Sequence, residues 1–404
     1  MKSMRIWSCL VVLLALLAVP GSSWALNEWT ILLYVVSDDK DTGLQEANAR
    51  GVQDMVRAGA PAGCEILAIE DLTNEKGGGG IFGGLFGDKK DGGASIFTIS
   101  KDGVKVEKKL GEVNMGSPYV LWDFFKWANE KHPAKRYALI FNSHGSGIFS
   151  WRGTGGTSSS NPGAVDFNPD RFVAYDTNDS DCLSVFEIVA VLKAFQTKLN
   201  GGRQLNVMGF DACLPASIEA LYQFRDSCEA MIGSADTTPL TGFPYGSIMR
   251  SLAKTVPADA KAFAQAVSDG GVRGMGYWNL GKAQELVFAY NNFVLAAAKA
   301  RKDGFQIDKT LPYGGKERYW DLEQTLKEVV RAPGSGPNAA ALAQMAKETL
   351  EAAVAARLVS SKGSLSVTWP NLEDYKQFRA FYKALDFAKE TQWDEYLDAE
   401  HGMK

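Results

Sequence analysis

The sequence lacks the features that mark several large classes of protein. Its 404 residues include 43 Lys and Arg against 47 Asp and Glu, giving a formal charge of −4, and no basic cluster offsets this balance. Nucleic-acid-binding surfaces need an excess of positive charge, so we expect no nucleic-acid partner. With 46% hydrophobic and 22% charged residues, the chain is also unlike disordered or collagen-like sequences.

Long hydrophobic runs are missing beyond the N-terminus. There, Lys2 and Arg5 precede a short apolar run from Cys9 to Val19, and small residues follow up to Ala25. This order is typical of a secretory signal cleaved after Ala25. The alternative is an uncleaved anchor, for which the run is short. We therefore expect residues 1–25 to be a signal peptide, and the mature protein to be periplasmic or extracellular without a membrane span.

Cysteine is also scarce. The mature chain keeps four cysteines, Cys64, Cys182, Cys213 and Cys228. Exported proteins can form disulfides, but four cysteines are too few for a scaffold built on them. The sequence leaves the pairing of these residues open, and we expect at least one free thiol.

Apolar segments alternate between strand-like and helix-like spacing from residue 29 to about residue 236. Alternation at this spacing predicts an α/β fold, in which a mostly parallel sheet carries helices on both faces. Beyond about residue 270 the pattern becomes mainly helical, with one strand candidate at 364–370. We therefore predict a main domain at 26–270 and a C-terminal, partly helical subdomain at 271–404.

Two predicted strands end in reactive side chains. "ALIFNSHGSG" delivers His144 to a glycine-rich turn, and "NVMGFDACLP" delivers Cys213 to a turn before a helix expected to start near Pro215. Ligands of open α/β sheets bind beyond the carboxyl ends of the strands. A helix N-terminus and a nearby imidazole would both favour a cysteine thiolate. The N–H groups of Gly145 and Cys213 could then hold a developing oxyanion.

Simpler interpretations exist for each of these residues. A lone histidine at a strand end is more often structural than catalytic, and cysteine is commonly just buried. His132 is expected to stabilise a helix end, and His401 lies in the tail. The combination of His144 and Cys213 on successive strand ends is the stronger signal.

The sequence resembles the clostripain family of cysteine peptidases, in the group that includes caspases, gingipains and legumains. The resemblance covers roughly residues 29–254 and includes "LGEVNMGSPYVLWDFFKWA", "YALIFNSHGSG", "AYDTNDSDCLSVFEI" and "FDACLPASIEALY". It implies a caspase-like fold, with His144 as the catalytic histidine and Cys213 as the nucleophile. It also implies protein or peptide substrates with Arg or Lys before the scissile bond.

The resemblance assigns the pocket for that basic side chain to two carboxylates. Asp211, two positions before Cys213, corresponds to the family's pocket aspartate, and Asp236 corresponds to a second acidic position. The family often has a glutamate-rich run there, whereas this chain has Ala235 before Asp236 and Thr237 after it. An alternative is that Asp211 caps the helix after Cys213, because aspartate is a favoured N-cap.

Two segments suggest further features. Some relatives use calcium, and an acidic cluster could hold this ion, although it lacks the glycine of an EF-hand loop. A solvated turn is the preferred interpretation of that cluster, and we expect no cofactor. The acidic cluster consists of Asp176, Asn178, Asp179 and Asp181.

The loop at about 151–171 is rich in Gly, Ser and Asn, which is typical of a site of self-cleavage.

These observations predict an exported cysteine endopeptidase that cleaves after Arg or Lys through an acyl-enzyme. A serine hydrolase is one alternative, since "HGSG" is similar to lipase oxyanion loops, but the sequence has no G-x-S-x-G elbow. A non-catalytic binding protein on a peptidase-like fold is the other. The presence of both His144 and Cys213 argues against lost catalysis.

Overall fold

A computed structural model describes residues 26–37, 43–71, 93–148, 172–314, 318–360 and 363–403. Two sequence-based predictions lie outside these residues: the signal peptide and the self-cleavage loop. Within the described residues, no helix combines the length and the apolar character needed to cross a bilayer.

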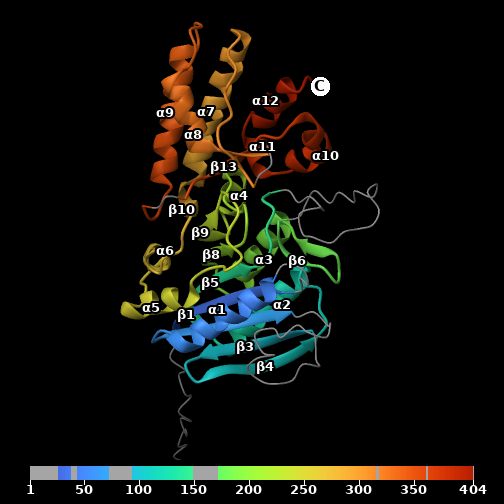
Figure 1. Cartoon of the computed structure of the whole chain (residues 1–404), viewed down its shortest axis with the longest axis vertical. Helices are drawn as coiled ribbons and strands as arrows, with labels where there is room; N and C mark the ends of the chain where they lie inside the picture. Colours follow the sequence, from blue (N-terminus) through green and yellow to red (C-terminus); the bar gives the residue numbers. More distant parts are fainter. Residues whose placement is uncertain are drawn as a thin grey trace, which may run out of the picture.

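An eight-stranded sheet forms the centre of the molecule, in the order β10-β9-β8-β5-β1-β2-β3-β4 (Figure 1). The five strands from β9 to β2 are parallel, while β10 and the pair β3–β4 are antiparallel additions at the two edges. The central strands are continuous apolar runs because both faces of a parallel sheet are covered. The strands are β1 (Asn27–Val36), β2 (Cys64–Asp71), β3 (Ala94–Ser100), β4 (Gly103–Gly111), β5 (Ala134–Asn142), β8 (Leu205–Asp211), β9 (Cys228–Ser234) and β10 (Met275–Asn279).

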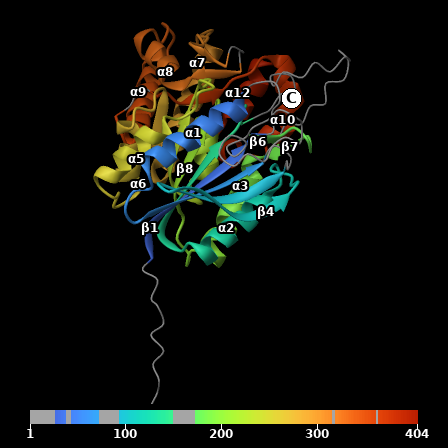
Figure 2. The ribbon, with the colours of Figure 1, turned by 60° about the horizontal axis from the view of Figure 1, so that its bottom comes forward.

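Helices cover both faces of this sheet (Figure 2). Alternate side chains of each strand point to opposite faces, and each face packs into its own hydrophobic core. The predicted mostly parallel sheet with two covered faces is therefore confirmed. One face carries α1 (Leu44–Ala58), α5 (Tyr245–Lys254) and α6 (Ala260–Asp269), and the other carries α2 (Pro118–Lys131), α3 (Val185–Lys198) and α4 (Ile218–Phe224).

Local sequence signals set several of the helix starts. Ser184 and Glu187 form a capping box, with each side chain bonded to the other residue's backbone N–H. Ser117 caps α2, and Pro118 follows at the first helical position, where its missing N–H costs nothing. These caps fix where α2 and α3 begin.

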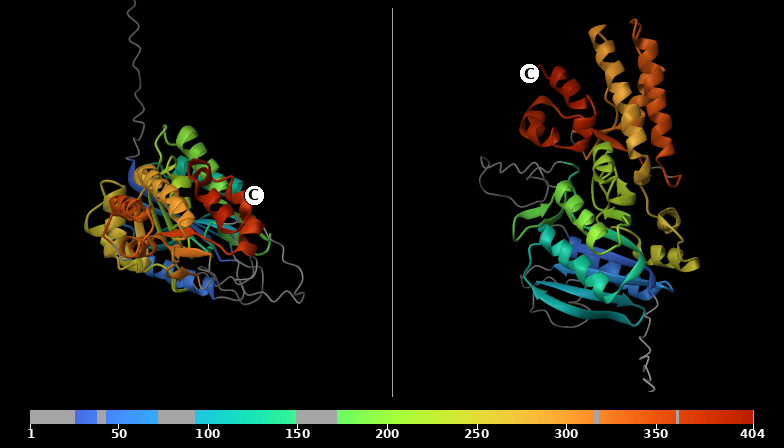
Figure 3. Two further views of the ribbon diagram at one scale, coloured as in Figure 1. Left: turned by 90° about the horizontal axis from the view of Figure 1, so that it is seen from above. Right: turned by 180° about the vertical axis from the view of Figure 1, so that it is seen from behind.

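The C-terminal region lies beyond the β10 edge of the sheet, and its helices form two groups (Figures 1 and 3). The predicted boundary at residue 270 precedes β10, so the sheet takes its edge strand from the segment assigned to the C-terminal subdomain. An antiparallel three-stranded sheet joins the two groups to the main sheet region. The elements are η1 (Leu280–Lys282), α7 (Ala283–Lys302), β11 (Pro312–Tyr313), β12 (Tyr319–Asp321), α8 (Leu322–Arg331), α9 (Ala339–Ala355), β13 (Ser366–Thr368), α10 (Leu372–Tyr382), α11 (Asp386–Glu390) and α12 (Trp393–Glu400).

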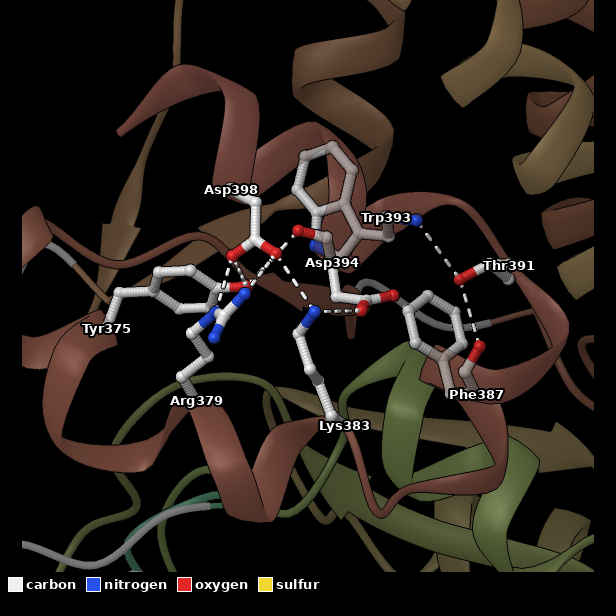
Figure 4. A network of polar contacts seen from close by, with 8 residues as sticks. All are labelled: Tyr375, Arg379, Lys383, Phe387, Thr391, Trp393, Asp394 and Asp398. Carbon is white, nitrogen blue, oxygen red and sulfur yellow. Dashed lines mark hydrogen bonds and ion pairs between the residues drawn. The ribbon is translucent and has the colours of Figure 1, made fainter. Parts of the chain in front are cut away.

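A polar network ties α10 to α12 (Figure 4). Arg379 forms two hydrogen bonds of 2.7 Å to the carboxylate of Asp398, one from Nε and one from Nη2. Lys383 adds ion pairs of 2.9 Å to Asp398 and 3.3 Å to Asp394. The hydroxyl of Tyr375 donates to Asp398 as well. These hydrogen bonds hold the pKa of Asp398 well below its usual range.

Candidate active site

The register of β5 and β8 brings the two predicted catalytic residues to the same edge. The strands are parallel, and Asn142 of β5 pairs with Asp211 of β8. His144 and Cys213 each lie two residues beyond that last pair. Both are partly exposed, so each is accessible at the carboxyl end of the sheet. This is the edge at which open α/β sheets bind ligands.

Gly145 packs directly on the backbone of Cys213. A methyl group placed on Gly145 would lie 2.4 Å from the carbonyl oxygen of Cys213 and 3.3 Å from its nitrogen. Only glycine allows this approach of the two turns. Within the described part of the chain, the N–H groups of Gly145 and Cys213 donate to no other group. The two predicted oxyanion donors are therefore adjacent and available.

The sulfur of Cys213 lies in a turn that is held by the loop after β9. The backbone N–H of Thr238 donates to Sγ at 3.3 Å, and the Thr238 hydroxyl lies 3.6 Å from the same sulfur. The next residue, Leu214, has a φ of 66°, a left-handed conformation that is rare for a branched side chain. Its N–H donates to the carbonyl of Asp236. Backbone of this kind persists only where its surroundings fix it.

The other two histidines lie elsewhere. His132 follows α2 and pairs through Nδ1 with Glu65 at 2.9 Å, near the start of β2 and so at the opposite edge of the sheet. His401 ends α12, where Nε2 lies 3.1 Å from the carbonyl of Pro370. The chain has three histidines in all. His144 is therefore the histidine that shares an edge with Cys213.

The other described cysteines are unsuited to nucleophilic chemistry. All four thiols in the described residues are free. Cys64 and Cys228 begin β2 and β9 at the opposite edge of the sheet, and burial raises the pKa of their thiols to about 11 and about 12. Cys182 is buried in β7 (Asp181–Leu183). Cys213 is the described cysteine that lies at the carboxyl edge.

Asp211 is buried beneath Cys213 rather than projecting into solvent, with 5% of its surface exposed. Its Oδ2 accepts hydrogen bonds from the N–H of Phe243 at 2.9 Å, the hydroxyl of Tyr245 at 3.0 Å and the amide of Asn142 at 3.2 Å. Oδ1 accepts none of these bonds. Burial raises the pKa of Asp211 to about 6, although the bonds from Phe243 and Tyr245 oppose this rise.

Asp236 lies on the exposed surface after β9. Its Oδ1 accepts hydrogen bonds from the N–H of Thr237 at 2.8 Å and from the N–H of Gly314 at 3.0 Å. Its main-chain carbonyl accepts from Leu214, next to Cys213. The backbone of Asp236 therefore lies beside the turn that carries Cys213.

Two expectations about the helix after Cys213 are wrong. The helix α4 begins at Ile218 rather than near Pro215, and its N-cap is Ser217, whose hydroxyl accepts from Ala220. Cys213 lies four residues before that cap, beyond the single turn over which a helix dipole acts. Asp211 is further still and does not cap α4. The sequence favoured an earlier start because proline is common at the first helical position.

The acidic cluster forms a hairpin of β6 (Val173–Asp176) and β7, and is only partly the solvated turn that we expected. Asp176 is 1% exposed, and its carboxylate accepts from the N–H groups of Met115 and Asp179. Asp181 accepts from the Asn114 amide at 2.7 Å. Within the described residues, no group of three or more His, Cys, Asp or Glu is arranged to hold a metal. Through the bonds from Asn114 and Met115, the cluster anchors the "GEVNMG" segment to this hairpin.

Sequence reasoning missed the contacts made by the loop after β9 and by Tyr245, the first residue of α5. Thr238 bonds to the sulfur of Cys213, and Phe243 and Tyr245 bond to Asp211. The segment "GSADTTPLTGFPY", which contains all three residues, is part of the resemblance to the clostripain family, but no pattern in it indicates which atoms they contact. The contact between Asn142 and Asp211 could have been predicted from the sequence, because a parallel register that aligns His144 with Cys213 also places Asn142 opposite Asp211.

Comparison with known proteins identifies the family of the chain. The model of the peptidase C11, clostripain family matches residues 85–311, more than half of the chain. The chain belongs to the clostripain family. Clostripain from Hathewaya histolytica is 28% identical in an alignment of 148 residues that covers 34% of this chain and 24% of that protein. The chain thus matches only about a quarter of that relative's length.

Two solved clostripain-family structures share the fold. A secreted C11 cysteine protease from Bacteroides thetaiotaomicron, in complex with an irreversible peptide inhibitor, has a TM-score of 0.63 at 16% identity. The superposition covers 91% of this chain and 99% of that one. An inactive zymogen C11 protease from Parabacteroides distasonis has a TM-score of 0.61 at 17% identity, covering 91% and 98%. The predicted caspase-like fold is confirmed.

Proposed function

We propose that this clostripain-family chain is an exported cysteine endopeptidase in which Cys213 and His144 form a catalytic dyad. The observation that supports this most strongly is the β5–β8 register, which carries a histidine and a cysteine to adjacent turns at the carboxyl edge of the sheet. The remaining described cysteines and the remaining histidines lie at the opposite edge or are enclosed by other contacts. The dyad therefore has one candidate for each role among the described residues.

The reaction follows from the chemistry of these groups. The thiolate of Cys213 attacks the carbonyl carbon of the scissile peptide, and the N–H groups of Gly145 and Cys213 stabilise the oxyanion that forms. The C–N bond then breaks as the imidazolium of His144 gives its proton to the leaving amine. Water, deprotonated by the neutral imidazole, hydrolyses the thioester and releases the thiolate.

The proposed selectivity is for Arg or Lys before the scissile bond. Asp211 adjoins the nucleophile's turn, and its Oδ1 takes none of the three hydrogen bonds that converge on Oδ2. That oxygen can accept from a guanidinium or an ammonium in a site with little water, where charged hydrogen bonds are strongest. The carboxylate of Asp236 adds negative charge at the surface of the same site. Export to the periplasm or the extracellular space rests on the N-terminal signal segment.

The test uses purified mature protein and fluorogenic peptides that differ only in the residue before the scissile bond. Wild type should prefer Arg or Lys, and Cys213→Ala or His144→Ala should each lower kcat/KM on the order of 1000-fold or more, since dyad members act as one unit. Cys64→Ala is the matched control, a partly exposed thiol at the other edge. Substantial hydrolysis by Cys213→Ala would exclude the assignment. A thiol-reactive peptide probe that fails to label Cys213 would favour a non-catalytic protein.

A further inference from the structure

The three-stranded sheet of the C-terminal region contacts the turns of the catalytic edge. Ser366 of β13 forms a parallel bridge with Ser217, and both its N–H and its hydroxyl donate to the carbonyl of Ala216, at 3.0 and 3.1 Å. These residues follow Cys213 by three and four positions. The C-terminal sheet therefore extends the backbone pairing directly into the segment that leads from Cys213 into α4.

A second contact reaches the turn that carries His144. Tyr319, the first residue of β12, is buried, and its hydroxyl donates to the carbonyl of Ser146 at 3.0 Å. Its ring lies against Gly147, where an added methyl group would come within 2.5 Å of the ring carbon Cζ. Gly147 has a φ of +77°, the left-handed conformation that favours glycine. The turn after His144 is thus shaped to receive the Tyr319 ring.

The same turn is fixed on its other side by β6. Gly145 forms an antiparallel bridge with Val173, and the N–H of Ser146 donates to the carbonyl of Phe172. The segment 145–147 is therefore clamped between β6, from the main domain, and Tyr319, from the C-terminal region. His144 immediately precedes this segment, so a shift in either contact, with β6 or with Tyr319, would displace the backbone of His144.

A third contact reaches the turn of the nucleophile. The N–H of Gly314, which follows β11, donates to the carboxylate of Asp236, whose carbonyl in turn accepts from Leu214. The side chain of Leu214 lies against Gly314, where an added methyl group would be 3.0 Å away. Gly314 and Tyr319 thus contact the turns on both sides of the dyad.

We infer that Tyr319 is a positioning residue of the proposed dyad: its hydroxyl bond to Ser146 sets the place of the His144 turn relative to Cys213. This inference rests on the proposed function, because it assigns the C-terminal region a role in that same site. Reaction at a nucleophile is sensitive to displacements of about 1 Å, which cost on the order of 100-fold in rate. Loss of the Tyr319 hydroxyl is therefore expected to lower turnover without changing which substrate binds.

The experiment compares Tyr319→Phe with wild type and with Tyr222→Phe. The control also loses a tyrosine hydroxyl that joins the main domain to the C-terminal region, since Tyr222 donates to Gln284 of α7 at 2.9 Å. We expect kcat of Tyr319→Phe to fall roughly 10- to 100-fold, with KM within about twofold and a thermal midpoint close to that of the control. The rate at which iodoacetamide alkylates Cys213, followed by peptide mass spectrometry, should fall as well.

Two results would overturn the inference. One is wild-type turnover and alkylation in Tyr319→Phe, and the other is an activity loss that merely follows the unfolded fraction in both tyrosine variants. If wild type itself hydrolyses no peptide, the proposed function fails. The alkylation rates of Cys213 then still decide whether Tyr319 positions the turn, because alkylation requires no substrate.

Discussion

Replacing Asp211 with asparagine should make the protein more stable at neutral pH and less active on basic substrates. Asparagine has nearly the same shape, and its oxygen can take the place of Oδ2 and keep the three bonds from Phe243, Tyr245 and Asn142. The amide NH₂ then replaces Oδ1, the oxygen that accepts none of those bonds. The substitution therefore removes a charge while it preserves the buried hydrogen bonds.

The gain in stability follows from the pKa of Asp211. Burial raises this pKa from the ordinary value of 3.8 to about 6, so ionising the folded protein is harder than ionising the unfolded chain. The carboxyl is neutral in both states below pH 3.8, and its cost to stability grows as the pH rises from there through about 6. At neutral pH this cost approaches roughly 3 kcal/mol, because each pH unit corresponds to about 1.4 kcal/mol. The Asp211→Asn variant would avoid it.

The loss of activity has a different cause. A guanidinium in the pocket loses one charged hydrogen bond, which is worth roughly 2 kcal/mol, or about 30-fold in kcat/KM for Arg substrates. Urea unfolding at pH 4 and pH 7 measures the stability difference, and matched Arg and neutral peptides measure the preference. A variant that is less stable at pH 7 would refute the burial argument. Retention of the full preference for Arg would show that Asp211 is not the selector.

Two further substitutions test other parts of the molecule. Gly145→Ala should lower kcat/KM roughly 100-fold, because the new methyl group would lie 2.4 Å from the carbonyl of Cys213; unchanged steady-state kinetics would contradict this packing. Asp398→Asn should lower the free energy of unfolding at neutral pH by roughly 2 kcal/mol, since Arg379 and Lys383 lose charged partners. Those partners depress the pKa of Asp398, so the loss in free energy of unfolding should persist until the pH falls below the usual aspartate range. Urea unfolding in which this loss disappears at a pH above that range would contradict the prediction.

Much of the main domain could be predicted because its elements depend on neighbouring residues. Apolar runs identify β1, β5 and β8, and the Ser184–Glu187 pair marks the start of α3. The short strands β11 and β12 could not be found in this way. They contain two and three residues, and β12 pairs with β13 across 45 or more positions of the chain. From the sequence, Tyr319–Asp321 looks like the beginning of the helix that follows.

Only part of the candidate site could be predicted from the sequence, for the same reason. The strand-end rule identified His144 and Cys213 because β5 and β8 are parallel neighbours. It could not identify the residues that hold Asp211, because Phe243 and Tyr245 follow it by 32 and 34 positions, after α4, β9 and the loop that comes next. The error about α4 has a similar origin. Proline at 215 favours a helix start by local preference, but the chain stays non-helical up to Ser217, which is extended and forms a bridge with Ser366 of β13.

The two glycines of "HGSG" are explained by contacts with residues that lie far away in the sequence. Gly145 is required by the backbone of Cys213, and Gly147 is required by the ring of Tyr319, 172 positions later. A methyl group at either place would collide with atoms of a different segment. The motif is therefore the point at which the main sheet, the turn of Cys213 and the C-terminal sheet meet. On this argument the C-terminal region belongs to the proposed catalytic unit, and a chain ending near residue 270 would lack one side of the clamp on the His144 turn.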